Sequence, residues 1–194
     1  MGRPWLVVVD MQNVFAPPGA NGLPSAQGSP WASPDYATAS EGIGRLLPAF
    51  GERVVYTRYV APAEPEGAWV PYFEMWPFAL VPEDDPLYDF APGIDPAGHD
   101  VVTKTTFGKW GTELAEATRH ASEIVLTGVS TDCCVISTAL PMADAGIAVR
   151  VPADACAGAS PADHQRALDA MALYAPLITV TTVDDVLAIF DPSS

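Results

Sequence analysis

A continuous apolar run near the start of the chain most constrains its fold. Residues 5–9 read Trp-Leu-Val-Val-Val, and the run ends at the carboxylate of Asp10. A strand exposed on one face alternates apolar and polar residues, whereas an unbroken apolar run is typical of a parallel strand covered on both faces. The sequence therefore predicts a parallel sheet, with Asp10 at the carboxyl end of one strand, where ligands bind in open α/β sheets.

Further strand-length runs alternate with segments of helical pattern. The predicted strands are 53–58, 99–103, 123–127, 147–151 and 177–181, and the predicted helices are 36–50, 112–120, 161–174 and 183–190. Another helix begins near Val135, and Pro141 is expected to kink it or end it early. This alternation predicts a single α/β domain over 1–194, with three α/β/α layers around a mostly parallel, roughly six-stranded Rossmann-like sheet. A glycine-rich nucleotide-binding turn is absent after the first strand.

Charge and cysteine content exclude several classes of function. The chain of 194 residues has a net charge of −15, which disfavours nucleic acid and anionic membrane surfaces as partners. With no apolar run of membrane-spanning length and no signal peptide, a cytoplasmic location is expected. Three cysteines at 133, 134 and 156 do not suggest a disulfide framework, and neither their spacing nor the scattered histidines suggest a structural zinc site.

Residues 59–98 are expected to form a long loop that is rich in proline and acidic residues. Its aromatic residues are Trp69, Tyr72, Phe73, Trp76, Phe78, Tyr88 and Phe90. A loop of this length inside a compact domain is usually functional or disordered, and so many aromatic side chains favour packing. We expect some of them to pack in the core or against another subunit and others to form the wall of a substrate pocket.

Three reactive side chains each follow a predicted strand: Asp10, Lys104 and Cys134. The carboxyl ends of parallel strands meet at one edge of a sheet, so these residues could meet there. Asp10 could take the thiol proton of Cys134, while Lys104 and the nearby helix start would favour the negative charges. Backbone N–H groups of the turn 128–134 could then bind an oxyanion.

Each of these residues also has a structural explanation when it is taken alone. A lone cysteine is more often a small buried apolar residue, Asp10 could cap a turn, and Lys104 could lie on the surface. Their shared position at strand ends favours a functional reading of the three together. Lysine is also scarce, since the chain has only Lys104 and Lys109.

Three segments, in order along the chain, resemble one known family. They are 7–15 (Val-Val-Val-Asp-Met-Gln-Asn-Val-Phe), 101–107 (Val-Val-Thr-Lys-Thr-Thr-Phe) and 128–135 (Gly-Val-Ser-Thr-Asp-Cys-Cys-Val). Together they resemble the isochorismatase-like cysteine hydrolases, which include nicotinamidases and N-carbamoylsarcosine amidases. The segment 146–157 fits the same pattern.

The resemblance implies roles for particular residues. It implies that Cys134, which directly precedes the valine of the motif, is the nucleophile, with Asp10 as the base and Lys104 as the third catalytic member. It also implies a cis peptide between Val129 and Ser130 that directs the N–H groups of Ser130 and Cys134 into an oxyanion hole. Cys133 would then point elsewhere and pack, and Cys156 would be structural.

Departures from the family pattern are equally informative. Nicotinamidases hold a metal through an Asp-x-His pair after the second strand and through a later Trp-Pro-x-His segment. Here those positions read Arg58-Tyr59-Val60-Ala61 and Trp76-Pro77-Phe78-Ala79. The sequence therefore predicts no catalytic metal and no cofactor, and it places nicotinamidase activity in doubt.

The substrate-binding residues expected from the resemblance are Phe15 and Trp76, with Trp110 as a weaker candidate, and structural packing is a close alternative for all three. The predicted function is hydrolysis of a small non-peptide amide, carbamoyl or lactam-like compound through a thioester, by a homo-oligomer, either a dimer or a tetramer. The alternatives are hydrolysis of the vinyl ether of isochorismate, against which Cys134 counts, and a non-catalytic binding protein that has kept the fold.

Overall fold

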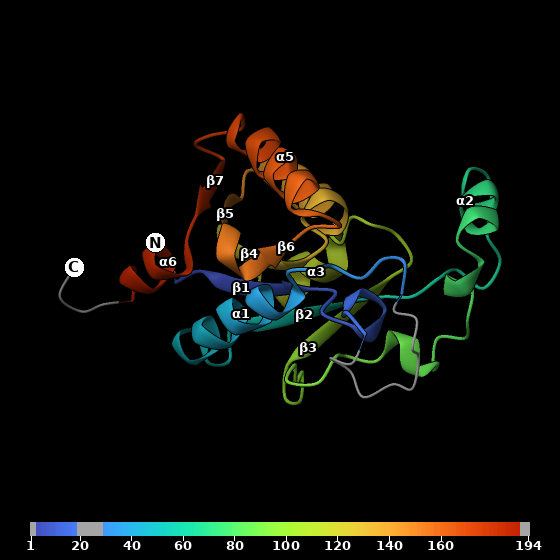
Figure 1. Ribbon diagram of the computed structural model, residues 1–194. Helices are drawn as coiled ribbons and strands as arrows, with labels where there is room; N and C mark the ends of the chain where they lie inside the picture. Colours follow the sequence, from blue (N-terminus) through green and yellow to red (C-terminus); the bar gives the residue numbers. More distant parts are fainter. Residues whose placement is uncertain (1–2, 19–28, 191–194) are drawn as a thin grey trace.

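The structure, a computed structural model, describes residues 3–18 and 29–190 (Figure 1). Its centre is a sheet with the strand order β3-β2-β1-β4-β5-β7, in which β6 pairs with β4 beyond the end of β5. Every strand pairing is parallel. The strands are β1 (Trp5–Val9), β2 (Val54–Tyr59), β3 (Asp100–Lys104), β4 (Glu123–Val129), β5 (Ala148–Pro152), β6 (Cys156–Ala157) and β7 (Ile178–Thr181). The predicted parallel α/β sheet is thus confirmed.

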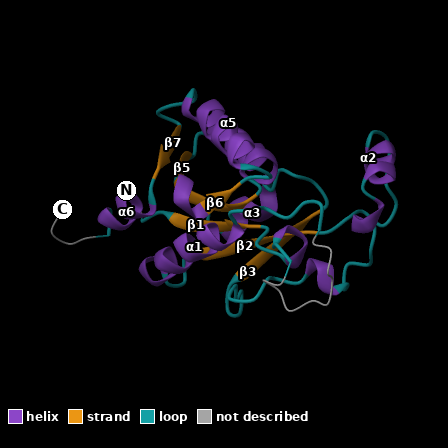
Figure 2. Ribbon diagram, viewed as in Figure 1, coloured by secondary structure: helices purple, strands orange, loops and turns teal. Residues whose placement is uncertain are grey.

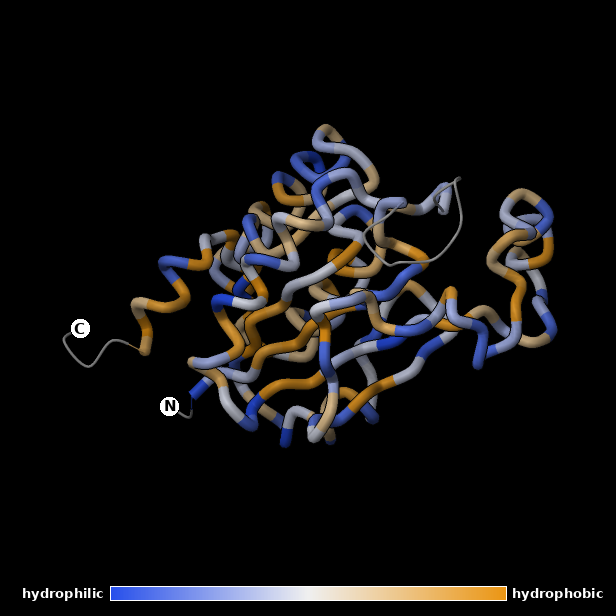
Figure 3. Tube along the Cα trace, turned by 60° about the horizontal axis from the view of Figure 1, so that its bottom comes forward, coloured by the Kyte–Doolittle hydropathy of each residue, from blue (hydrophilic) through white to orange (hydrophobic). Residues whose placement is uncertain are grey.

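Helices cover both faces of this sheet (Figure 2). Buried residues of α1 (Tyr36–Phe50) and α6 (Val183–Ala188) pack with Leu6 and Val8 of β1. On the other face, α3 (Thr112–Ala117), α4 (Ile136–Asp144) and α5 (Pro161–Ala172) pack with Val7 and Val9. Alternate residues of β1 therefore belong to two separate cores, which explains the continuous apolar run. The apolar strands lie inside the molecule, between more polar helices (Figure 3).

The helix that contains Pro141 does not end early. A five-residue π-helical turn (Thr131–Val135) leads into α4, which continues through Pro141 to Asp144. Proline at 141 has no N–H to donate to the carbonyl of Ser137, four residues earlier. That carbonyl faces Gly108, where a Cβ atom would lie only 2.7 Å from the Ser137 oxygen. The segment after β3 thus packs closely against the part of α4 that proline leaves without its helical hydrogen bond.

The segment 60–98 contains local structure, and Gln12 links the residue before it to Tyr88 within it. It includes α2 (Trp69–Met75) and two 3-10 turns (Pro77–Ala79 and Pro86–Tyr88), and α2 stands away from the sheet in Figure 1. Gln12 Nε2 donates to the carbonyls of Tyr59 and Tyr88 at 2.9 and 2.7 Å, and its Oε1 accepts the Tyr59 N–H at 2.7 Å.

Among residues 3–18 and 29–190, none of the helices has the length and the apolar composition that a membrane-spanning helix needs.

Gly128 allows β1 and β4 to approach closely at the edge that carries the candidate site. The two strands are in register, with Val9 opposite Gly128. Gly128 has a φ of +106°, and a Cβ atom there would lie 2.1 Å from the carbonyl oxygen of Val9. Both the backbone conformation and the close contact require glycine. Asp10 and the cysteine turn follow directly after these two strand ends.

Candidate active site

Asp10 is held rigidly and fully buried at the carboxyl end of β1. Its backbone has a φ of 49°, a left-handed conformation that aspartate adopts more readily than most residues. Its Oδ1 accepts a hydrogen bond of 2.6 Å from the Thr57 hydroxyl of neighbouring β2. The Asp10 N–H in turn lies 3.3 Å from Thr57 Oγ1. These contacts fix the carboxylate, so that Oδ2 faces the residues described next.

Lys109 supplies the cation beside this carboxylate. Its Nζ lies 2.9 Å from Asp10 Oδ2, and both side chains are 0% exposed. The ammonium also donates to the carbonyl of Thr106 at 2.8 Å and lies 5.3 Å from the centre of the Tyr59 ring. A buried charge requires such compensation, because its desolvation is otherwise very costly. The Asp10–Lys109 pair is therefore a buried ion pair whose charges are compensated by each other and by neighbouring groups.

The expectation that Lys104 would lie beside Asp10 is wrong. Lys104 Nζ forms a salt bridge of 2.7 Å with Glu113, which is 62% exposed, and its own side chain is 27% exposed. The reason is topological, since β3 is the edge strand and β2 separates it from β1. Lys109 reaches Asp10 because the loop after β3 turns back towards α4.

Thr138 holds Lys109 and Cys134 in a common arrangement. The Lys109 N–H donates to Thr138 Oγ1 at 2.9 Å, and that hydroxyl donates to the carbonyl of Cys134 at 2.7 Å. Thr138 is fully buried in α4. One hydroxyl therefore links the loop that carries the lysine to the turn that carries the cysteine, a link that strand patterns do not predict.

Cys134 lies in the π-helical turn that follows β4. The peptide bond between Val129 and Ser130 is cis, as the resemblance implies. The Ser130 carbonyl accepts the N–H groups of Cys133 and Val135 at 3.1 and 3.0 Å, the second of which is the five-residue bond of a π-helix. Such turns are frequent at functional sites. Cys134 is 3% exposed.

The surroundings of Cys134 favour the thiol over the thiolate. Burial raises the pKa of Cys134 well above its usual value, and the Asp10 carboxylate adds to the increase through its charge and through hydrogen bonding. The positive charge of Lys109 opposes this effect without reversing it. The expectation that a lysine favours negative charge on the sulfur agrees in direction with this effect, although the lysine is Lys109 and not Lys104. The site thus combines a thiol, as proton donor, with a carboxylate.

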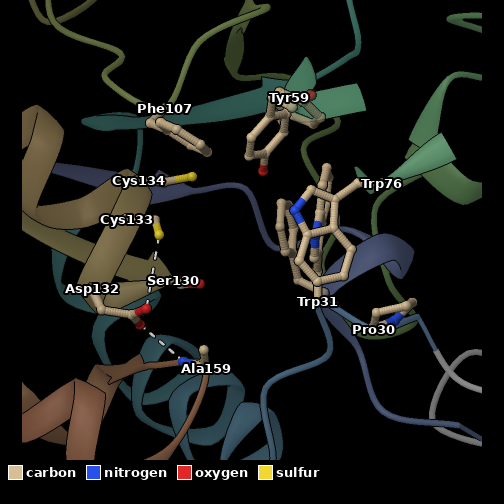
Figure 4. A pocket seen from close by; sticks show the side chains of 12 residues that line it. Pro30, Trp31, Tyr59, Trp76, Phe107, Ser130, Asp132, Cys133, Cys134 and Ala159 are labelled. Carbon is tan, nitrogen blue, oxygen red and sulfur yellow. Dashed lines mark hydrogen bonds between the residues drawn. The ribbon is translucent and has the colours of Figure 1, made fainter. Parts of the chain in front are cut away.

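A cavity of about 330 Å³ opens onto Cys134 (Figure 4). Its described lining residues are Phe15, Pro30, Trp31, Tyr59, Tyr72, Trp76, Phe107, Ser130, Asp132, Cys133, Cys134 and Ala159. Six of these twelve are aromatic, so the cavity suits a flat apolar group. Of the three expected substrate-binding residues, Phe15 and Trp76 line the cavity. Trp110 is not among the described lining residues and packs against the core beneath α4 and α5.

Trp31 is the centre of the aromatic wall, and sequence reasoning missed it. Its ring contacts those of Phe15, Tyr59, Tyr72, Trp76 and Phe78, with centroids 4.9 to 6.2 Å away. It lies in a stretch of sequence rich in Pro, Gly, Ser and Ala (16–34) that has no helix or strand pattern to interpret. A single tryptophan within such a stretch was the available indication, because a large apolar side chain there requires a packing partner.

Cys133 also lines the cavity, so the expectation that it would point elsewhere is wrong. Its Sγ lies 3.8 Å from Asp132 Oδ2, and Asp132 Oδ1 accepts the Ala159 N–H at 2.9 Å. Burial and the neighbouring Asp132 raise the pKa of Cys133 to about 11. The π-helical turn places consecutive cysteines at the same opening. Cys156, by contrast, is buried in the core beside the carbonyl of Leu126, as expected of a structural residue.

Histidine, cysteine and carboxylate side chains do not gather at this opening as a metal site requires. Within residues 3–18 and 29–190, no three of them are arranged so that they could hold one ion. Tyr59 turns its ring to Lys109, whose Nζ lies over it. The arrangement instead combines a buried thiol, a carboxylate and an ammonium at an apolar cavity.

Solved structures share this architecture. A cysteine hydrolase from Pseudomonas syringae pv. phaseolicola 1448A has a TM-score of 0.82 at 21% identity, with 99% of this chain and 94% of that chain covered. An N-carbamoylsarcosine amidase from Thermoplasma acidophilum has a TM-score of 0.71 at 24% identity, covering 94% and 98% of the two chains. At such identities the likeness establishes the fold alone.

Sequence comparison establishes the family. Isochorismatase domain-containing protein 2 of Xenopus laevis is 37% identical over 82 residues, which span 41% of this chain and only 40% of that relative. The model of the isochorismatase domain matches residues 4–185, which include the whole sheet and every residue of the site described above. The chain therefore belongs to the isochorismatase domain family of hydrolases.

Proposed function

We propose that this hydrolase cleaves the C–N bond of a small, uncharged amide, carbamoyl or lactam-like compound through a thioester on Cys134. The observation that carries the proposal is the Cys134 thiol, which opens onto an aromatic cavity and faces the buried Asp10–Lys109 pair. A thiol beside a carboxylate base is the arrangement of an activated nucleophile. We assign the third catalytic role to Lys109 in place of Lys104.

In the first half-reaction, Asp10 takes the thiol proton as the sulfur attacks the substrate carbonyl carbon. Because burial and Asp10 disfavour the thiolate, we expect proton transfer to accompany the attack. The N–H groups of Ser130 and Cys134 are the proposed donors to the oxyanion. When the tetrahedral intermediate collapses, the C–N bond breaks and protonated Asp10 gives its proton to the leaving nitrogen.

In the second half-reaction, water replaces the departed amine or ammonia. Asp10 removes a proton from the water, whose oxygen attacks the thioester carbonyl. The C–S bond then breaks, and the sulfur recovers its proton from Asp10 while the acid product leaves. Lys109 keeps the carboxylate oriented and compensates its charge each time Asp10 returns to the ionised form.

The charge of the cavity wall supports an uncharged substrate. Among the described lining residues, Asp132 is the single charged side chain, and it is negative. A carboxylate in the cavity would lose hydration without gaining a cationic partner, since the ammonium of Lys109 is already engaged by Asp10 and Thr106. This disfavours isochorismate, a dicarboxylate, and carbamoyl amino acids.

The test is an ammonia-release screen over small neutral primary amides, ureas and lactams, with lactams followed by loss of the ring absorbance. We expect at least one compound to be turned over by the parent protein and by Cys133→Ala but not by Cys134→Ala. Trapping a thioester of the expected mass on Cys134 would add direct support. Full turnover by Cys134→Ala would refute the mechanism, and absence of turnover with any compound would favour a non-catalytic binding protein.

A further inference from the structure

One buried polar atom in the cavity wall has no partner within the described structure. Tyr59 is 2% exposed, and its hydroxyl has no hydrogen-bond partner among the described residues. Leaving such a group unpaired is costly, so its site requires an explanation. The position of the Tyr59 ring is explained by its contacts with the ammonium of Lys109 and with Trp31. None of these contacts explains the unpaired hydroxyl.

The hydroxyl is directed into the cavity beside the reacting sulfur. In Figure 4, Tyr59 and Cys134 point into the same space, and Ser130 lines the cavity at a different place from Tyr59. Burial raises the pKa of Tyr59, so the phenol stays neutral. A neutral phenol can both donate and accept a hydrogen bond.

We propose that Tyr59 Oη binds the amide N–H of the substrate and thereby selects primary amides and unsubstituted lactams or carbamoyl groups. The inference rests on the proposed function. If the N–H groups of Ser130 and Cys134 bind the carbonyl oxygen, the nitrogen of the planar amide points away from them, and Tyr59 Oη is the unpartnered polar atom available to it in the cavity wall. The atom that completes the hydrogen bonding of Tyr59 is then the leaving nitrogen itself.

The productive orientation of the amide is thereby favoured. A planar amide in an apolar aromatic cavity could exchange the places of oxygen and nitrogen, and only one orientation leads to reaction. The backbone N–H groups of Ser130 and Cys134 can only donate, so a flipped amide would place its own N–H against them, whereas Oη can accept from the nitrogen in the productive orientation. Tyr59 is therefore a specificity-determining residue.

The experiment compares binding of two probes of the same shape, benzamide and acetophenone. Acetophenone has a methyl group in place of the NH₂ and keeps the carbonyl oxygen. Ligand-observed NMR titrations are made with Cys134→Ala protein, so that binding is measured without turnover and separately from the catalytic mechanism. Tyr59→Phe is then added, which removes Oη while the ring against Lys109 remains.

We expect Tyr59→Phe to weaken benzamide about tenfold and to leave acetophenone unchanged, as the loss of one buried hydrogen bond predicts. Tyr36→Phe is the matched control, since Tyr36 is also buried with an unpartnered hydroxyl but packs in the core of α1, outside this cavity. It should change neither affinity. Equal effects on both probes, no effect on benzamide, or no saturable binding of benzamide would each overturn the inference.

Discussion

Lys109 and Asp10 form a salt bridge of 2.9 Å between two side chains that are both fully buried. Each charge depends on the other, because neither has access to bulk water. The lysine has a second partner in the carbonyl of Thr106, and the aspartate has one in the hydroxyl of Thr57. Loss of either charge is therefore expected to lower both stability and activity. Because Lys104 lies outside this pair, substitutions can distinguish the roles of the two lysines.

Lys109→Met is expected to abolish turnover and to lower the free energy of unfolding by roughly 3–5 kcal/mol, since it leaves the Asp10 charge buried and unpaired. Lys104→Met is the matched control. It breaks a partly exposed bridge to Glu113 and should cost no more than about 1 kcal/mol with full activity. Urea denaturation and the ammonia assay measure both effects. An inactive Lys104→Met with an active Lys109→Met would reverse the assignment.

Asp10→Asn is expected to lower the pKa of Cys134 and still to reduce turnover. The carboxylate raises the pKa of the thiol, so its removal leaves the opposing effect of Lys109 to favour thiolate at a lower pH than in the parent protein. Without a base to move protons, turnover should fall about 10²–10⁴-fold. The pH dependence of alkylation of Cys134, read by intact mass, gives the pKa. A higher alkylation pKa in Asp10→Asn would contradict this arrangement.

Thr138→Val tests the hydroxyl that joins Lys109 to Cys134. The change keeps the shape but leaves the Lys109 N–H without its acceptor, which predicts a loss of about 1–3 kcal/mol in stability. Because the lysine loop and the cysteine turn are then no longer linked, kcat should fall more than KM rises. Thr118→Val, directly after α3, is the control, since it also removes a buried hydroxyl that donates to a helix carbonyl. Equal kinetic effects of the two variants would argue against a positioning role.

Terephthalamide and terephthalamate provide a test of charge selection. The two probes have the same shape, but one carries a second neutral amide where the other has a carboxylate. Because Asp132 is the one charged side chain among the described lining residues, the anion should bind roughly tenfold or more weakly. Asp132→Asn should reduce the difference in affinity between the two probes when both are titrated at low ionic strength. Tighter binding of terephthalamate would indicate a cationic contact in the site and would remove the argument against anionic substrates.

The strand patterns predicted the sheet and the positions of two candidate site residues, because both residues follow buried strands. Asp10 and Cys134 follow buried strands whose apolar runs are visible in the sequence, and those strands are neighbours in register. Lys109 lies in a loop whose path depends on Thr138 and on the contact of Gly108 with Ser137, which involve residues far apart in sequence. Periodicity ends where a strand ends, so it could not distinguish Lys109 from Lys104. Trp31 was missed for the same reason.

The contact of Gly128 with Val9 has a consequence for any attempt to redesign this protein. An alanine at 128 would meet the Val9 carbonyl at 2.1 Å, so the ends of β1 and β4 would have to separate. Asp10 and the cysteine turn follow directly after those two ends, so the distance between the Asp10 carboxylate and the Cys134 sulfur would increase. The spacing of β1 and β4 thus sets this distance, and a redesign of the aromatic cavity wall should keep glycine at 128.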